Sequence, residues 1–275
     1  MLWLRVTSSV IFLTLVWLSL RYPGFGWFIP AVILVATAIG TWEYCALARK
    51  KGLRIFASVA IIFSMTALCA AWKSELRLLP ALLAVTLVLI MTAQLILGGI
   101  ANFAANVGAN VFGLLYVSLP MALMMNVVNK RELVVRVVVF FVLVSWSSDT
   151  GAYFVGRAFG KNKLAPKISP GKTVEGSLGG VGLSLLSAIL LTLLWPGMRE
   201  IFPLFPALLL ALLFSVIGQA GDLVESALKR DAGQKDSGQI YTGMGGMLDV
   251  IDSMLVCAPI LYSYLMLRLP GLDWF

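Results

Sequence analysis

Long apolar segments alternate with short polar connectors along the whole chain. Nine segments are each long enough, or nearly so, for the roughly 20 residues that a membrane-spanning helix needs. The pattern therefore predicts an all-α polytopic membrane protein with about nine transmembrane helices. Gly108, Gly113 and Pro120 interrupt one segment and could divide it into two half-helices. The predicted spans cover residues 6–20, 25–42, 55–72, 79–97, 101–127, 134–156, 177–196, 202–221 and 249–267.

The composition supports this interpretation and limits the chemistry. Hydrophobic residues make up 60% of the 275 positions and charged residues only 12%, which is far more apolar surface than a soluble domain needs. The chain contains no His, so the commonest general base and metal ligand is missing. Any bound metal would have to take oxygen ligands, and such ligands suit hard cations such as magnesium.

The basic charge is distributed as in a membrane protein. The net charge of +8 is carried by Lys and Arg in the connectors, which argues against nucleic-acid binding. With nine spans, thirteen cations fall on one side and eight on the other, so the positive-inside rule places the three largest polar loops, and a polar cleft between them, on the cytoplasmic face. The thirteen are Arg5, Arg49, Lys50, Lys51, Arg54, Arg157, Lys161, Lys163, Lys167, Lys172, Lys229, Arg230 and Lys235.

Charge is concentrated in the stretch 218–253, which separates the last two predicted spans. Asp222 and Glu225 end one span and Asp249 and Asp252 begin the next, and a spacing of three places each pair on one helical face. Two such pairs from neighbouring helices would repel one another unless cations neutralise them. Lys229, Arg230 and Lys235 can hold phosphate oxygens, while Gly243, Gly245 and Gly246 allow close backbone approach before the last helix.

Two further features point to the same chemistry. Asp149 lies inside an apolar segment beside several hydroxyl residues, where a lone carboxylate has to be paired, hydrated or bound to a cation. The following stretch 156–180 has no hydrophobic period, and we interpret it as a loop that offers ammonium and N–H groups to phosphates. With no His, Ser or Cys nucleophile evident, these groups favour phosphoryl or nucleotidyl transfer by positioning and charge neutralisation.

The motifs of these two stretches resemble those of a known family. SALKRDAGQKDSGQIYTGMGGMLDVIDS at 226–253 is similar to the signature of the CDP-diacylglycerol synthases, the phosphatidate cytidylyltransferases, and DTGAYFVGRAFGKNKLAPKISPGKTVEGSLGG at 149–180 also looks like that family. The resemblance implies that phosphatidate attacks the α-phosphorus of CTP to give CDP-diacylglycerol and pyrophosphate. It also implies Mg²⁺ as the cofactor, leaves a second cation open, and suggests a homodimer in the bacterial inner membrane.

The resemblance assigns roles to individual residues. It implies metal ligation by Asp222, Asp249 and Asp252, with Asp149 and Glu225 as further ligands, and a catalytic role for Lys229, Arg230, Lys235, Asp236 and Asp249. It implies substrate binding by Ser169, Lys172, Thr173, Glu175, Gly243, Gly245 and Gly246. For Glu175 two roles stay open, holding its own loop or contacting a cytidine group. We expect residues 1–130 to form an amino-terminal group of transmembrane helices and 131–275 to form the catalytic region.

Departures from the signature keep alternatives open. The family has His and Arg where this chain has Met244 and Val250, which would fit a catalytically weakened or silent paralogue. A CTP-dependent polyprenol or phytol kinase would use similar residues but transfer the γ-phosphate. A secondary transporter or channel would also explain an intramembrane Asp149, although its polar residues should line both halves of a pathway, whereas here they cluster on one face.

Overall fold

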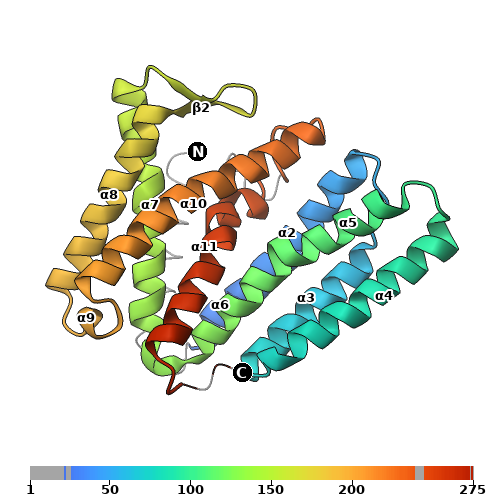
Figure 1. The fold of residues 1–275 in the computed structure, drawn as a ribbon, viewed down its shortest axis with the longest axis horizontal. Helices are drawn as coiled ribbons and strands as arrows, with labels where there is room; N and C mark the ends of the chain where they lie inside the picture. Colours follow the sequence, from blue (N-terminus) through green and yellow to red (C-terminus); the bar gives the residue numbers. More distant parts are fainter. Residues whose placement is uncertain (1–21, 23–25, 239–244, 273, 275) are drawn as a thin grey trace.

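The computed structural model describes residues 22, 26–238, 245–272 and 274. The first predicted span, 6–20, and residues 239–244 of the signature, among them Gly243 and Met244, lie outside the described residues. The described chain is almost entirely helical, as the sequence predicts (Figure 1). The long helices are α2 (Phe28–Lys50), α3 (Ala57–Trp72), α4 (Leu79–Gly98), α5 (Phe103–Gly113), α6 (Leu119–Asn129), α7 (Arg131–Phe159), α8 (Val174–Leu194), α10 (Leu204–Asp231) and α11 (Met247–Arg268).

Short elements connect the long ones. The 3₁₀ turn η2 (Leu76–Leu78) leads into α4, the π-helical turn η3 (Leu114–Ser118) joins α5 to α6, and α9 (Met198–Ile201) precedes α10. Strands β1 (Lys163–Ala165) and β2 (Ser169–Thr173) pair antiparallel between α7 and α8. The stretch predicted as a plain loop therefore contains a small hairpin, which its sequence conceals because SPGKT lacks the alternation of apolar and polar residues by which strands are recognised.

Seven stretches of the described chain are long and apolar enough to cross a membrane. The α5–η3–α6 stretch is one of them, so its glycines and proline do not divide it into separate half-helices. At 16 residues, α3 is about 24 Å long at 1.5 Å per residue, less than the roughly 30 Å of a bilayer core. The count of nine spans, and the orientation that depends on it, stay predictions.

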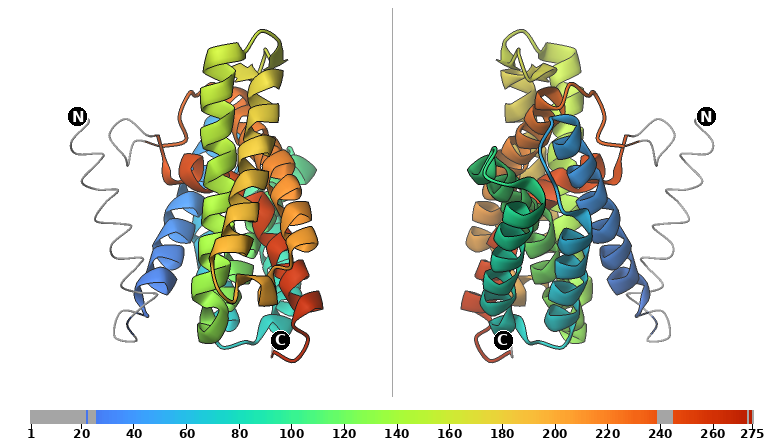
Figure 2. Two further views of the ribbon diagram at one scale, coloured as in Figure 1. Left: turned by 90° about the vertical axis from the view of Figure 1, so that its left-hand side faces the viewer. Right: turned by 90° about the vertical axis from the view of Figure 1, so that its right-hand side faces the viewer.

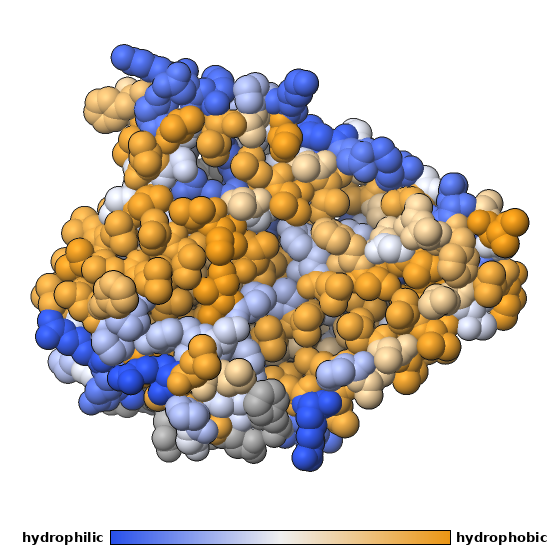
Figure 3. All heavy atoms as spheres, viewed as in Figure 1, coloured by the Kyte–Doolittle hydropathy of each residue, from blue (hydrophilic) through white to orange (hydrophobic). Residues whose placement is uncertain are grey.

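The surface has the polarity expected of a membrane protein. Apolar residues form a broad band across the face shown in Figure 3, and polar residues gather along its upper and lower edges. Large apolar side chains on several helices are exposed, among them Ile96 on α4, Leu178 on α8 and Phe205 on α10. A continuous exposed apolar band is costly in water but stable against lipid tails, and the chain is an all-α polytopic membrane protein.

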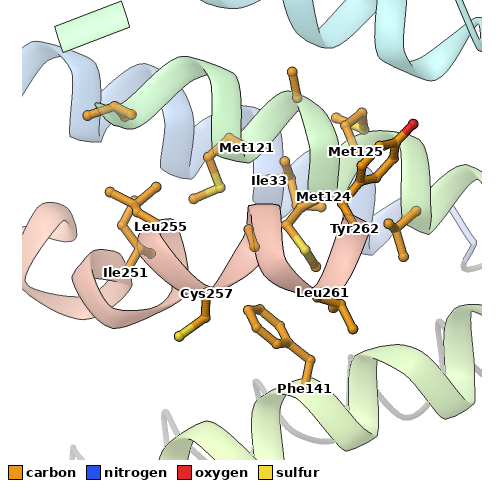
Figure 4. Close-up of a cluster of buried hydrophobic side chains, with 14 of the residues drawn as sticks. Ile33, Met121, Met124, Met125, Phe141, Ile251, Leu255, Cys257, Leu261 and Tyr262 are labelled. Carbon is orange, nitrogen blue, oxygen red and sulfur yellow. The ribbon is translucent and has the colours of Figure 1, made fainter. Parts of the chain in front are cut away.

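Helix α11 lies at the centre of the fold. It packs against α10, α6 and α2, and a buried cluster surrounds it (Figure 4). In that cluster Ile251, Leu255 and Leu261 of α11 pack with Met121 of α6 and Phe141 of α7. Because α11 also carries Asp249 and Asp252, this packing holds the end of the chain's signature against helices that precede it by more than 100 residues.

Helices α7 and α8 form an upright pair that carries the β-hairpin at its tip (Figure 2). Their backbones are close because small residues face one another. A Cβ at Gly151 would lie 2.5 Å from the carbonyl oxygen of Gly179, and one at Gly176 would lie 2.7 Å from that of Ala152. Small-residue contacts of this kind let transmembrane helices pack closely, and here they fix the hairpin relative to α7.

Two helices run further than their apolar segments. Helix α2 continues to Lys50 instead of ending near residue 42, and α10 continues to Asp231 instead of ending near residue 221. The hydropathy of a segment marks where the chain leaves the apolar layer, whereas the helix persists because its backbone hydrogen bonds continue past that point. The extra turns bring Glu43, Asp222, Glu225 and Lys229 onto helices.

Candidate active site

The predicted site residues come together where α10 ends, α11 begins and the β-hairpin lies. On α10, Asp222, Glu225 and Lys229 follow the i, i+3, i+7 spacing of one helical face. Helix α11 packs on α10 and adds Asp249 and Asp252 from its first two turns. The carboxylates from the two helices therefore meet, as the spacing predicts, but they divide into two clusters around two lysines.

The first cluster is centred on Lys229. Its ammonium forms ion pairs with the carboxylates of both Glu225 and Asp249. The Glu225 side chain is only 1% exposed, and those of Lys229 and Asp249 are each 13% exposed. Asp249 also accepts the N–H of Gly246 at 2.7 Å and the Ser237 N–H at 3.1 Å, and the Ser237 hydroxyl lies 2.8 Å away. We call Lys229, Glu225, Asp249 and Ser237 the Lys229 cluster.

Glu43 of α2 supports this cluster from behind, a role that the sequence analysis missed. Its carboxylate accepts the backbone N–H groups of Met247 at 3.0 Å and Leu248 at 2.7 Å and lies 3.2 Å from the Ser237 hydroxyl. Glu43 is buried, and it satisfies N–H groups that the first turn of α11 leaves without helical partners. The apolar pattern placed residues 43–54 in a connector. The available signal that Glu43 lies on a helix was that apolar residues compatible with a helix flank this carboxylate.

Glycines permit this close approach. A Cβ at Gly246 would collide with Ser237 and with both carboxylate oxygens of Glu43. Gly245 has φ +86°, in the left-handed region that side chains disfavour, and a Cβ there would meet the Asp249 carboxylate. The predicted need for small residues before α11 therefore applies at these two positions, and Gly243 lies outside the described residues.

The second cluster is centred on Lys172 of β2. Its ammonium lies 2.6 Å from the Asp222 carboxylate, and the carboxylates of Asp149, Asp222 and Asp252 interact electrostatically with one another and with Lys172. Asp252 is 6% exposed and accepts the N–H of Ser253. We call Lys172, Asp222, Asp149 and Asp252 the Lys172 cluster; it holds three carboxylates for one ammonium.

Together the two clusters carry an excess of negative charge, five carboxylates against two ammonium groups. Carboxylate oxygens suit a hard cation such as Mg²⁺, so the donor chemistry and the charge fit the predicted metal. In the described part of the chain, however, no three acidic or cysteine side chains are grouped closely enough to hold an ion. The fit is thus one of ligand type and charge, and the ligands are not arranged around a common point.

The remaining hairpin residues have structural contacts. Thr173 caps α8, its hydroxyl accepting the Gly176 N–H at 3.1 Å. Glu175 accepts the N–H of Lys161 at 3.1 Å and the side-chain amide of Asn162 at 2.7 Å, so here it holds its own loop. Ser169 pairs with Ala165 in the hairpin. Of the four residues in or next to the hairpin that were predicted to bind substrate, Lys172 is the one that contacts a carboxylate of α10.

The other predicted catalytic residues lie at the surface. Arg230 donates to the carbonyl oxygens of Ile168 at 3.4 Å and Gln234 at 3.1 Å, which ties the end of α10 to the hairpin. Lys235 and Asp236 are exposed on the segment that follows α10. Neither has a described contact with the two clusters, so their catalytic role stays a prediction.

The predicted polar cleft also stays a prediction. The described surface has an open hollow lined by Leu190, Leu191, Leu194, Trp195 and Pro196. It is apolar and lies at the end of α8 opposite to the hairpin and the two clusters.

Comparison with known proteins agrees with the resemblance found in the motifs. The model of the cytidylyltransferase family matches residues 3–268. The phosphatidate cytidylyltransferase of Synechocystis is 34% identical over 98% of this chain and 98% of its own length. That of Bacillus subtilis is 42% identical, with the match covering 58% of this chain and 59% of the relative. That of Chlamydia muridarum is 30% identical over 95% of this chain and 91% of its own length.

The family match extends across the helical framework as well as the signature. It includes α2, which supplies Glu43, the hairpin that supplies Lys172, and the two helices that supply the carboxylates. The resemblance inferred from the motifs at 149–180 and 226–253 is thereby confirmed over almost the whole chain, and the protein belongs to the cytidylyltransferase family.

Proposed function

We propose that this protein is a phosphatidate cytidylyltransferase, which transfers CMP from CTP to phosphatidate and releases pyrophosphate. The observation that carries the proposal is the meeting of acidic and basic side chains at the ends of apolar helices, in a chain that matches relatives of that name over nearly its full length. A lipid substrate enters from the membrane and a nucleotide from water, so the reaction needs a charged site at a membrane edge.

In the proposed reaction a phosphate oxygen of phosphatidate attacks the α-phosphorus of CTP. One P–O bond forms, the bond between the α-phosphorus and the bridging oxygen breaks, and the electron pair leaves with pyrophosphate. No residue has to form a covalent intermediate, so the protein acts by positioning the substrates and neutralising their charges.

The two partly buried lysines, Lys172 and Lys229, can still bind phosphate oxygens. The Lys172 ammonium contacts Asp222 as an ion pair but makes no hydrogen bond within the described residues. An ammonium has three N–H donors, so Lys172 can still donate to a phosphate oxygen. Lys229 donates one hydrogen bond, to Asp249, and pairs with Glu225 by charge. Arg230, Lys235, Ser169 and Thr173 lie on neighbouring segments and are proposed to contribute more peripherally.

Magnesium is part of the proposal. Asp222, Asp249 and Asp252, with Asp149 and Glu225, are the proposed ligands, and the ion would supply positive charge to the phosphates. We also propose that the site faces the cytoplasm of a bacterial inner membrane, where CTP is available, because the cation-rich connectors lie on its side of the predicted topology. The family resemblance further supports a homodimer.

Labelled CTP tests the reaction. Purified protein should transfer the α-phosphate label of CTP into lipid when given phosphatidate and Mg²⁺. Label from the γ-phosphate in the lipid would instead identify a lipid kinase, and no labelled product with several divalent ions would overturn both. Asp249→Asn should abolish transfer, because it removes the charge that holds Lys229 and the Gly246 N–H. Asp231→Asn, at an exposed ion pair with Lys51, is the matched control.

A further inference from the structure

A π-helical turn, η3, interrupts the span between α5 and α6 and contains Tyr116. In η3 the N–H of Leu119 donates to the carbonyl of Leu114, five residues earlier. Pro120 has no N–H, so it cannot form the usual bond to the carbonyl of Tyr116, which favours the irregular turn. Turns of this kind reorient side chains and are common at functional sites.

The turn lies beside the first turns of α11. At Gly40 of α2, Val117 of η3 and the Ile251 and Leu248 side chains of α11 all come within 4.0 Å of the position a Cβ would take. The turn η3, which carries Tyr116, also packs directly against α11. Residue 116, which no motif of the sequence marks, therefore lies on a turn next to the helix that carries Asp249 and Asp252, where the charges of Asp252, Glu225 and Asp222 affect its hydroxyl.

The Tyr116 hydroxyl has no hydrogen-bond partner within the described residues, although the side chain is only 8% exposed. Its neighbour Ser118 lies 2.7 Å from the Ser64 hydroxyl, which lies 3.2 Å from that of Thr41. A buried hydroxyl without a partner is costly and uncommon, and a ligand is one of the ordinary explanations. The ring itself is fixed by stacking on Phe112 at 5.3 Å, so the hydroxyl is held in place.

We propose that Tyr116 is a substrate-binding residue whose hydroxyl donates a hydrogen bond to a phosphate oxygen of the bound CTP or phosphatidate. The inference rests on the proposed cytidylyltransferase activity. The hydroxyl is a neutral donor among carboxylates, so it can contact a phosphate without adding to the charge repulsion that a further acidic group would cause. Its direct effect is on binding and positioning the substrate.

Tyr44 provides a matched control. Its ring also contacts Phe112, at 5.9 Å between ring centres and tilted by 40°, and it is similarly buried. Its hydroxyl, however, donates to the carbonyl of Ala109 at 2.6 Å. Tyr116→Phe and Tyr44→Phe therefore each remove one buried hydroxyl from the same group of three aromatic side chains, which Phe112 completes. Only Tyr44→Phe removes a hydrogen bond that is present in this structure.

The test measures melting temperature in detergent without substrate, and kcat and KM for each substrate with the other saturating. For Tyr116→Phe we expect an unchanged or higher melting temperature and a kcat/KM lower by about tenfold to a hundredfold for one substrate. A loss seen with CTP assigns the contact to the nucleotide, and a loss seen with phosphatidate assigns it to the lipid. Tyr44→Phe should lower the melting temperature and keep kcat/KM within about twofold.

The inference is overturned if Tyr116→Phe keeps kcat/KM for both substrates, if the two variants lose activity equally, or if only the Mg²⁺ requirement changes. These outcomes differ from failure of the proposed function, because in that case the parent protein itself forms no α-labelled lipid. Melting with CTP alone gives a readout without turnover: if the contact is to the nucleotide, CTP should raise the melting temperature less in Tyr116→Phe than in the parent.

Discussion

The two lysine clusters contain the same kinds of side chain but differ in how well their charges are satisfied. In the Lys229 cluster the ammonium bridges two carboxylates, and Asp249 also accepts backbone and hydroxyl donors. In the Lys172 cluster Asp222 contacts the ammonium, and Asp149 and Asp252 add further negative charge. Asp249 is thus well supplied with donors, although neither oxygen of Glu225 accepts a hydrogen bond within the described residues. The second cluster has the larger excess of negative charge, which a cation or a cation–phosphate complex could neutralise.

The difference indicates that the two clusters have different tasks, which the sequence motifs did not distinguish. The family resemblance implied metal ligation by all five carboxylates and did not distinguish between them. The arrangement indicates that the Lys229 cluster, with Glu43 behind it, chiefly fixes the start of α11. The Lys172 cluster is the better candidate for the place where the cation and the phosphates first bind. Three predictions test this division. The first concerns the support of the Lys229 cluster, the second compares the two clusters, and the third lies outside both.

The largest expected effect is that of Glu43→Ala on stability. Its removal leaves two N–H groups of α11 without their buried acceptor, and each unsatisfied group costs about 1–3 kcal/mol. We expect a loss of about 3 kcal/mol or more in the free energy of unfolding, together with loss of activity. Denaturant titration in detergent measures the first and CTP turnover the second.

Two control substitutions sharpen this test. Glu43→Gln retains one acceptor oxygen and should recover part of the stability. Glu75→Ala removes an exposed carboxylate, paired with Arg77, and should change stability by about 1 kcal/mol or less. If Glu43→Ala were as mild as Glu75→Ala, the claim that the Lys229 cluster is anchored through α2 would be wrong.

Glu43 also illustrates what the sequence can and cannot predict. The apolar periodicity located the helices because burial and lipid contact both require apolar segments of fixed length. It could not locate helix ends at Lys50 and Asp231, since a helix continues into water at little cost. A residue at position 43 and an amide at position 248 meet only through packing, and neither spacing nor composition records that contact.

The sequence predicted which residues form the site better than it predicted which of them contact one another. Spacing along α10 and α11 correctly brought Asp222, Glu225, Asp249 and Asp252 to one place. It did not reveal that Lys172 and Lys229 already contact these carboxylates, because a motif gives the identities of charged groups and not their pairing. Nor could it reveal Tyr116, whose position depends on a local π-helical turn.

A moderate effect is expected when one carboxylate of each cluster is neutralised. Asp222→Asn should raise the Mg²⁺ concentration for half-maximal activity by about tenfold or more, because the Lys172 cluster then attracts a cation less strongly. Glu225→Gln should shift that concentration by a smaller factor and should change stability more, since Glu225 is buried against Lys229. Magnesium titrations of CTP turnover, paired with melting curves, separate the two. Equal magnesium shifts in both variants would remove the distinction between the clusters.

The smallest effect is expected outside both clusters, where α2 and α10 are also joined at their ends. Lys51 lies 2.5 Å from Asp231, but the two side chains are 46% and 60% exposed, and Lys50 donates to Gln234 at 2.8 Å. Exposed pairs of this kind contribute little, so Asp231→Asn should change the free energy of unfolding by about 0.5 kcal/mol or less, with turnover unchanged. Denaturant titration at low and high salt measures this, because a real ionic contribution would shrink as salt is added. A large, salt-sensitive loss would mean that surface charges at the end of α10 also hold α2 in place, and the buried contact of Glu43 with α11 could then no longer be treated as the main polar anchor of α2.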